Sequence, residues 1–344
     1  MSRQVRVVEG LRFDRVPFDE LFAGNEPVLM RGLTADWPLV KAGRESTARV
    51  MDMLAQKYNE NYNKKPVIVY VGDAEMGGRF TYNESLTDFN YRSERLDFVE
   101  VLDRIRADLG SEVHPYYYMN SLVVDQSFPG LAAQNSLVFD HPVFERYPRV
   151  GKIWIGTESI AAAHYDVPRN IACCVLGRRR FTLFRPEQIR NLYPGPLNPT
   201  PGGQVVTMAN LRQPDFVRFP RLRQALDEAW VADMEPGDAL YYPSLWWHEA
   251  EALDRFNVMM NYWWVDSPRY MGDPMDVMMH AMLGLRDRPL VDRQGWRELF
   301  DYYIFGDNSV PREHLPEHVH GALADMNEEN ARRIRDAVAN SLKR

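Results

Sequence analysis

Short apolar runs separated by Pro and Gly turns dominate the middle of the chain. Between Tyr116 and Asp266 the candidates are YYYMNSLVV, GKIWIG, NIACCVLG, RFTLF, QVVTM, ALYYP and NVMMNYWWV. Regularly spaced short strands with turn residues between them are typical of a sandwich, jelly roll or barrel. We therefore predict that residues 115–268 form a mainly β core, a double-stranded β-helix whose open end provides a ligand cavity.

A mixed pattern precedes this β-rich segment. Ser46 stands where an N-cap is expected before an apolar helix face, and the segment from Arg95 to Gly110 repeats apolar residues at spacings of three and four. The run VIVYVG between them has the β-branched composition of a strand. Residues 1–114 are therefore expected to form an α+β lead-in that packs on the core.

The carboxyl-terminal segment, residues 269–344, has helical spacing. In PMDVMMHAMLGL the methionines recur on one face, which predicts that they pack in the core. The tail from His318 onward places apolar residues around a polar middle, as an amphipathic hairpin does. Such a hairpin packs on its own domain or forms a helix-mediated homodimer. No low-complexity linker separates the segments, so we expect one compact unit with helical ends.

Composition narrows the class of protein. The 344 residues are 45% hydrophobic and 26% charged, as in a soluble globular protein, and the formal net charge of −7 disfavours nucleic acid as a partner without excluding tRNA. No apolar run approaches the ~20 residues that span a bilayer, so no membrane role is expected. Cys173 and Cys174 are adjacent and would point to opposite faces of a strand, which disfavours a disulfide and fits a reducing, cytoplasmic location.

Three polar residues stand out against the apolar strands. His164 and Asp166 share one face of an extended strand, and His248 follows much later inside LYYPSLWWHEAEAL. Taken singly, His248 fits a core or surface histidine, and Asp166 fits a turn before Pro168. Together, two imidazoles and one carboxylate are the set that holds non-haem Fe(II) and leaves three coordination positions open. The sequence therefore predicts an iron-dependent oxygenase.

A competing metal motif occurs near the carboxyl terminus. His314, Glu317 and His318 spell H-x-x-E-H, one of the zinc-protease patterns. That motif requires both histidines on one helix, and Pro316 does not fit a helix interior. We expect no zinc site there.

The order of motifs between Trp154 and Trp264 resembles that of a known family. This stretch carries, in order, HYD, GRRRFTLFRPEQ, NLYPGPLNP, PDFVRFP, MEPGDALYYPSLWWHEAEAL and NVMMNYWW, and PVLMRGLTADWP is a looser match near the amino terminus. These motifs resemble the JmjC-type, cupin-like Fe(II) and 2-oxoglutarate-dependent oxygenases, in the branch of the asparaginyl hydroxylase that acts on hypoxia-inducible factor. The resemblance implies Fe(II) as the metal and 2-oxoglutarate as cosubstrate.

The resemblance also implies roles for individual residues. His164, Asp166 and His248 would be the catalytic and metal-ligating residues. The residues expected to contact the cosubstrate are Tyr117, Asn170, Arg179 and Asn261, with Trp263 near the pocket wall. Arg179 stands where the family usually has Lys, and its planar guanidinium can bind a carboxylate through two hydrogen bonds. Strand alternation then leaves Arg178 and Arg180 at solvated positions.

One position departs from the family pattern. Ala161 stands three residues before the first ligand, where the family commonly has a Thr or Ser whose hydroxyl helps to hold 2-oxoglutarate. The loss of that hydrogen bond would cost roughly 1–3 kcal/mol, which weakens cosubstrate binding without abolishing it.

The expected activity is hydroxylation of a C–H bond, with succinate and carbon dioxide as coproducts. Relatives of this family act on protein or peptide side chains, small molecules and tRNA bases, and the acidic net charge favours a protein or peptide substrate. The alternative is a cupin-like protein that binds a metal or a small molecule without oxygenase activity, and Ala161 is the residue in its favour.

Overall fold

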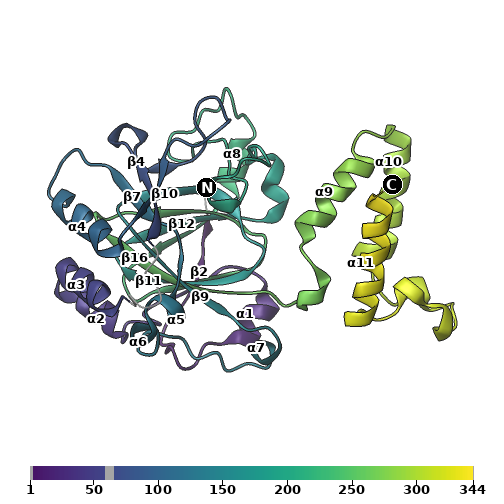
Figure 1. Ribbon diagram of the computed structural model, residues 1–344, viewed down its shortest axis with the longest axis horizontal. Helices are drawn as coiled ribbons and strands as arrows, with labels where there is room; N and C mark the ends of the chain where they lie inside the picture. Colours follow the sequence, from purple (N-terminus) through teal and green to yellow (C-terminus); the bar gives the residue numbers. More distant parts are fainter. Residues whose placement is uncertain (1–2, 59–65, 344) are drawn as a thin grey trace. The chain divides into compact units, whose positions relative to one another are not determined.

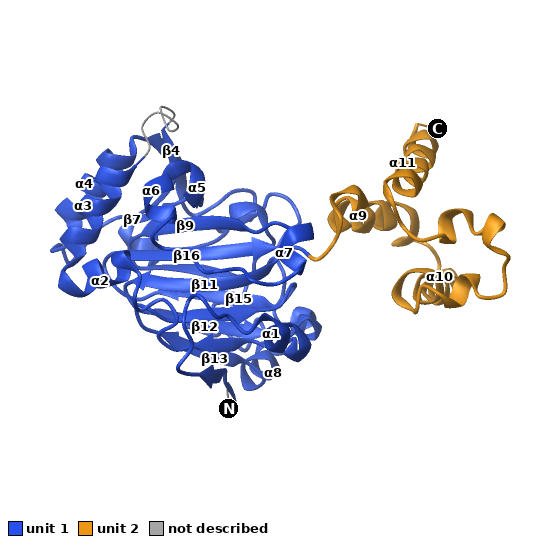
Figure 2. Cartoon of the chain, turned by 90° about the horizontal axis from the view of Figure 1, so that it is seen from below, with its two compact units in different colours: residues 1–265 blue, residues 266–344 orange. Residues whose placement is uncertain are grey.

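The computed structural model of the protein describes residues 3–58 and 66–343. It separates into two compact units, Met1–Val265 and Asp266–Arg344, drawn in different colours in Figure 2. The expectation of one compact unit is therefore wrong. The amino-terminal lead-in is part of the first unit, and the division lies close to the predicted boundary after residue 268.

The first unit contains two β-sheets. The six-stranded sheet has the order β1 (Arg3–Gln4), β13 (Trp230–Met234), β12 (Arg179–Phe184), β15 (Trp247–Ala252), β10 (Ser159–Tyr165) and β5 (Arg79–Phe80). The larger sheet has the order β2 (Arg6–Val8), β3 (Val28–Met30), β14 (Ala239–Tyr242), β11 (Arg169–Leu176), β16 (Asn257–Trp264), β9 (Val150–Gly156), β7 (Tyr116–Met119), β4 (Val67–Gly72) and β6 (Arg92–Leu96), with β8 (Leu122–Val123) on β9. Consecutive strands alternate between the sheets from β9 to β12 and again from β13 to β16, as in a double-stranded β-helix.

Side chains from both sheets meet in an inner core. Leu29, Cys174 and Met259 of the larger sheet pack there with Phe181 and Leu183 of the smaller one. The neighbouring residue in the chain, Cys173, points the other way, into the core outside the larger sheet. Both thiols are free and buried, as strand alternation predicts for adjacent cysteines.

Helices cover the outer face of the larger sheet (Figure 1). The helices of the first unit are α1 (Phe18–Gly24), α2 (Pro38–Glu45), α3 (Thr47–Lys57), α4 (Phe98–Asp108), α5 (Val124–Ser127), α6 (Pro129–Ala132), α7 (Val143–Arg146) and α8 (Leu222–Asp227), with 3₁₀ turns at Ala74–Met76, Pro186–Arg190 and Pro201–Gly203. The predicted cap of α3 is confirmed, because the Ser46 hydroxyl accepts a hydrogen bond from the Arg49 backbone N–H at 3.2 Å. Asp97 caps α4 in the same manner.

The second unit is helical. It contains α9 (Pro274–Leu285), α10 (Leu290–Phe300), a π-helical turn at Asp301–Phe305 and α11 (Glu328–Leu342), with 3₁₀ turns at Arg269–Met271, Val310–Arg312, Glu317–Val319 and Gly321–Leu323. The predicted amphipathic hairpin is wrong, since the tail forms the single helix α11. The prediction that the methionine face is core is also wrong. No residue of α9 is buried, and Leu283 is 79% exposed.

Candidate metal centre

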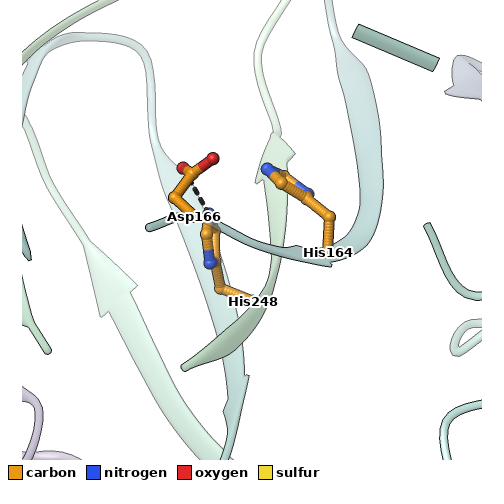
Figure 3. Close-up of side chains that lie close together, drawn as sticks. All are labelled: His164, Asp166 and His248. Carbon is orange, nitrogen blue, oxygen red and sulfur yellow. Dashed lines mark ion pairs between the residues drawn. The ribbon is translucent and has the colours of Figure 1, made fainter. Parts of the chain in front are cut away.

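The three predicted metal ligands come from two paired strands. His164 lies near the end of β10, Asp166 follows that strand directly, and His248 lies at the start of β15 opposite His164 in the register. The pairing shifts between Ala161 and His164, and such a bulge re-aims the side chains that follow it. The three side chains point toward one another in Figure 3.

The ligand atoms of this triad are close to bonding distance from a common point. Nε2 of His248 lies 3.7 Å from Oδ2 of Asp166, and one ligand atom from each residue lies within 4.8 Å of the others. Bonds of about 2 Å to one ion require separations of roughly 4 Å or less, so small side-chain rotations complete the site. Among the residues that the structure describes, this is the one group of His, Cys, Asp or Glu side chains that meets these criteria.

Backbone carbonyls fix both imidazole rings. Nδ1 of His164 lies 2.9 Å from the Ala162 carbonyl, and Nδ1 of His248 lies 3.0 Å from the Trp246 carbonyl. Because a carbonyl only accepts, each Nδ1 is the donor in this contact, which leaves Nε2 as the ring atom that can bind a metal. This is the arrangement by which ligating histidines are held in the metal-binding tautomer.

Burial shapes the charge of the triad. Desolvation, followed by the neighbouring His164, holds the pKa of His248 well below its usual value, so this imidazole is neutral and able to bind a cation. Desolvation raises the pKa of Asp166, and His164 opposes that shift. Among the described residues no Lys or Arg forms an ion pair with Asp166, and a bound metal would supply a cation beside this buried carboxylate.

The triad lines a cavity between the sheets of about 860 Å³ including its open mouth. The predicted residues Asn170, Asn261 and Trp263 also line it. Asn261 donates to Asn170 at 3.1 Å and accepts from the Trp154 indole at 2.7 Å. Asn170 in turn donates to the hydroxyl of Tyr242.

Arg179 is buried on the inward face of β12, two residues before the cavity residue Phe181, and is not itself among the residues that line the cavity. Arg178 pairs with Asp254 and Arg180 pairs with Asp233 at the surface, as strand alternation predicts. No carboxylate lies within ion-pair distance of Arg179 in the part of the chain that the structure describes, and its buried Nε has no hydrogen-bond partner.

An anionic ligand would satisfy this guanidinium. Desolvation lowers the pKa of Arg179, and Cys174 and Tyr118 are its electrostatic neighbours. A buried cation of this kind is costly unless a negative group pairs with it. The unpartnered Nε and the charge therefore fit the carboxylate of a 2-oxo acid.

Tyr117 does not lie where the resemblance places it. Its side chain packs in the core outside the larger sheet with Met119, on the opposite face of β7 from the cavity. The adjacent Tyr118 lines the cavity and is the electrostatic neighbour of Arg179. Successive strand residues point to opposite faces, so one position of misalignment exchanges the two tyrosines. Because three tyrosines follow one another, the sequence does not show which of Tyr117 and Tyr118 faces the cavity.

The remaining expectations concern Ala161 and the H-x-x-E-H motif. Ala161 lines the cavity with a methyl group, so no hydroxyl is present at that point of the wall. Pro316 precedes the 3₁₀ turn Glu317–Val319, and His314 lies before it. Within the described part of the chain these histidines form no metal-binding group.

Two further cavity residues were not found from the sequence. Tyr242 places its hydroxyl 3.3 Å from Nε2 of His248, and Trp154 anchors the Asn261 amide. Both occupy inward positions of strands that pair with strands bearing predicted site residues, β14 with β11 and β9 with β16. Alternation within ALYYP and GKIWIG was the signal that could have identified them.

Comparison with known proteins agrees with this architecture. Residues 15–270 match the cupin-like domain family, and the chain therefore belongs to that family. The predicted relationship to cupin-like, JmjC-type proteins is confirmed, as is the predicted jelly-roll fold with helical additions.

Three relatives show the kinds of protein to which the chain is similar. It is 26% identical over 176 residues to the lysine-specific demethylase JMJ31 of Arabidopsis thaliana, a match that covers 51% of this chain and 29% of the relative. It is 35% identical over 113 residues to human HSPB1-associated protein 1, covering 32% and 22%. It is 31% identical over 113 residues to the tRNA wybutosine-synthesizing protein 5 of Mus musculus, covering 33% of each. The chain thus matches a third or less of each relative's length.

Proposed function

We propose that this protein is an Fe(II)- and 2-oxoglutarate-dependent dioxygenase that hydroxylates a C–H bond. The observation that carries the proposal is that a candidate metal site and an arginine without a carboxylate partner are both buried in the first unit. His164, Asp166 and His248 form a group of the kind that holds a metal cation, and buried Arg179 has no carboxylate partner among the described residues. A metal chelated by a 2-oxo acid whose far carboxylate reaches Arg179 meets both requirements.

Individual residues have the following proposed roles. The triad holds Fe(II) on one face and leaves three coordination positions for the cosubstrate and dioxygen. Arg179 binds the far carboxylate as a cation, with Tyr118 taking the place first expected for Tyr117. When bound, Fe(II) and 2-oxoglutarate supply the oxidising chemistry, with succinate and carbon dioxide as coproducts.

The chain's own contribution is to orient these groups and to limit water. Asn170 and Asn261 form one network with Trp154 and Tyr242, which fixes the amides beside the cosubstrate position. Aromatic rings surround the rest of the cavity, including Tyr118 packed against Trp154. Such walls exclude competing reactions with solvent.

We propose a protein or peptide side chain as the substrate. Apart from the metal triad, the groups that line the described cavity are aromatic, aliphatic or amide. The acidic net charge disfavours the polyanionic backbone of nucleic acid. The printed names of the relatives include a lysine demethylase and a tRNA-modifying protein, so a tRNA base and a small molecule remain the alternatives.

Succinate formation tests the proposed activity. Protein loaded with Fe(II) is incubated with 2-oxoglutarate and air, and succinate is measured by mass spectrometry. We expect slow turnover without substrate and saturable binding of 2-oxoglutarate to the Mn(II)-loaded protein. Absence of both would instead assign the chain to the cupin-like binding proteins without oxygenase activity.

We also propose that the second unit mediates a homodimer. Among its described residues only Pro311 and Ala331 are buried, while Leu283, Val291 and Phe305 are each more than 70% exposed. A helical surface this apolar requires a covering partner, and an identical copy supplies a matching one.

The oligomeric state can be measured by sedimentation. We expect a dimer that Leu283→Arg converts to a monomer. The matched control is Val217→Arg, which changes a residue of the first unit that is 96% exposed and should leave the dimer intact. A wild-type monomer would contradict the proposal.

Buried free thiols and the reducing setting that they fit support a cytoplasmic location. No helix in the described residues is long and apolar enough to span a bilayer.

A further inference from the structure

Lys152 is half-buried beside one wall of the candidate metal cavity, next to the lining residue Trp263 although not itself among the lining residues. Lys152 is two residues before Trp154 on β9, so the two side chains share the face that lines the cavity. Its register partner on β16 is Asn261, which lies beside the proposed cosubstrate position. Lys152 is therefore at the end of the sheet where the metal ligands gather.

The ammonium of Lys152 has only weak partners. Its Nζ lies 6.0 Å from the centre of the Trp263 ring and 3.4 Å from the Ser121 hydroxyl. Among the described residues no carboxylate forms an ion pair with it, and burial is the one cause of its pKa shift. Burial lowers the pKa of Lys152, as expected for a cation that has lost water without gaining an anion.

A second donor nearby is also unsatisfied. The Trp263 indole N–H is buried and has no hydrogen-bond partner in the described structure, although the ring lines the cavity. Lys152 and Trp263 are neighbours, so a cation without a carboxylate partner and an indole N–H without an acceptor belong to adjacent side chains. A single carboxylate suits this arrangement, because nucleic acid is bound through several cations and no Lys or Arg is among the residues that line the described cavity.

We propose that Lys152 binds an acidic side chain of a peptide substrate that lies beside the hydroxylated residue. This inference rests on the proposed hydroxylase function and deepens it, since it names the charge that the substrate must carry. Lys152 would be a specificity-determining residue that contacts substrate outside the metal coordination sphere. The neutral residue to be oxidised would enter the aromatic cavity, and its acidic neighbour would remain at the edge.

Peptide pools test this assignment. The full chain, loaded with Mn(II) and 2-oxoglutarate so that no turnover occurs, is exposed to a random peptide pool containing Asp and Glu. A second pool has Asn and Gln in their place, and bound peptides are quantified by mass spectrometry. We expect about tenfold stronger retention of the acidic pool, which corresponds to one partly buried charge pair.

Variants of Lys152 give the decisive comparisons. Lys152→Met should abolish the preference, Lys152→Arg should retain most of it, and Lys152→Glu should reverse it toward a pool rich in Lys. The matched control is Lys41→Met, because Lys41 is exposed on α2 and paired with Asp36. It should behave as the wild type does.

Three results would overturn the inference. These are equal retention of both pools by the wild type, an acidic preference that survives in Lys152→Met, and Lys152-dependent binding of a single-stranded oligonucleotide in place of the acidic peptides. Binding of 2-oxoglutarate and succinate formation without peptide are measured in parallel. If they persist while the charge preference is missing, only the role of Lys152 fails. If they are missing too, the proposed function fails.

Discussion

The two faces of the six-stranded sheet differ in whether their buried charged side chains have partners within the protein. On the outer face, Glu251 forms an ion pair with Arg212, and Arg79 donates to the carbonyls of Thr207 and Ala209. Most charged groups there have partners within the protein, although Arg79 Nε and Glu249 Oε2 are buried without a hydrogen-bond partner among the described residues. On the inner side, among the described residues, Arg179 has no carboxylate partner and Asp166 of the metal triad forms no ion pair with Lys or Arg.

This difference separates a structural role from a ligand-binding one. Buried charges that are paired within the chain hold segments together, and their removal should alter stability more than binding. Buried charges that lack partners destabilise the free protein and are satisfied only when a ligand arrives. The outer face should therefore respond to changes mainly in folding, and the inner side mainly in binding.

The largest expected effect is the loss of the metal site in His248→Ala. Removal of one of three ligands should reduce bound Fe(II) to a trace and lower succinate formation by at least about 100-fold. Metal content by mass spectrometry and succinate yield measure the two effects. The matched control is His318→Ala, a histidine of the H-x-x-E-H motif, which should leave metal content unchanged. Loss of metal in the control alone would move the site to the second unit.

Arg179→Met tests whether the unpaired charge on the inner side serves to bind the cosubstrate. Loss of a charge-assisted contact of ~1.5–3 kcal/mol predicts that 2-oxoglutarate binds roughly 10- to 100-fold more weakly. The ligand-free variant should be at least as stable as the wild type, because an unpaired buried cation has been removed. Calorimetry and thermal unfolding with and without 2-oxoglutarate measure both quantities. Arg180→Met changes the exposed neighbour, which pairs with Asp233, and should alter neither.

Glu249 on the outer face should show the opposite behaviour. Burial, followed by the neighbouring Glu251, raises the pKa of Glu249 to about 8 from an ordinary value of 4.5. The folded state therefore retains this proton up to about pH 8, whereas the unfolded state loses it above about pH 4.5. The contribution of Glu249 to stability is complete below pH 4.5 and declines as the pH rises to 8.

Glu249→Gln should remove this pH dependence. The amide resembles the protonated acid, so the variant should be more stable than the wild type by about 1–3 kcal/mol at pH 9 and should match it near pH 5. Urea unfolding at pH 5, 7 and 9 measures the difference, and exposed Glu145→Gln is the control. A variant whose stability parallels that of the wild type across this range would show that Glu249 is ionised throughout.

Strand alternation explains how much of the site could be read from the sequence. It placed Arg179 inward between two solvated arginines, separated Cys173 from Cys174, and brought His164 and Asp166 to one face. These assignments depend only on a period of two and on recognition of the strand. Tyr117 was misplaced because three consecutive tyrosines give no internal marker of register, and a shift of one residue reverses the face.

The second unit shows what a local pattern leaves undetermined. The apolar spacing of PMDVMMHAMLGL predicted a helix, and α9 spans Pro274–Leu285. Spacing identifies an apolar face but does not say what covers it, since a core and an interface use the same residues. Whether a segment joins its neighbour depends on contacts between residues far apart in the chain, which periodicity does not contain.

The smallest expected effect concerns Ala161, the cavity residue whose methyl group replaces the hydroxyl common in the family. Ala161→Thr should tighten 2-oxoglutarate binding by about fivefold, because one hydrogen bond to a carboxylate contributes ~1 kcal/mol net. Ala161→Val is the matched control, since it has nearly the same shape without the hydroxyl and should not improve binding. Equal gains in both variants would attribute the effect to packing, and no gain in either would mean that the cosubstrate does not approach this wall.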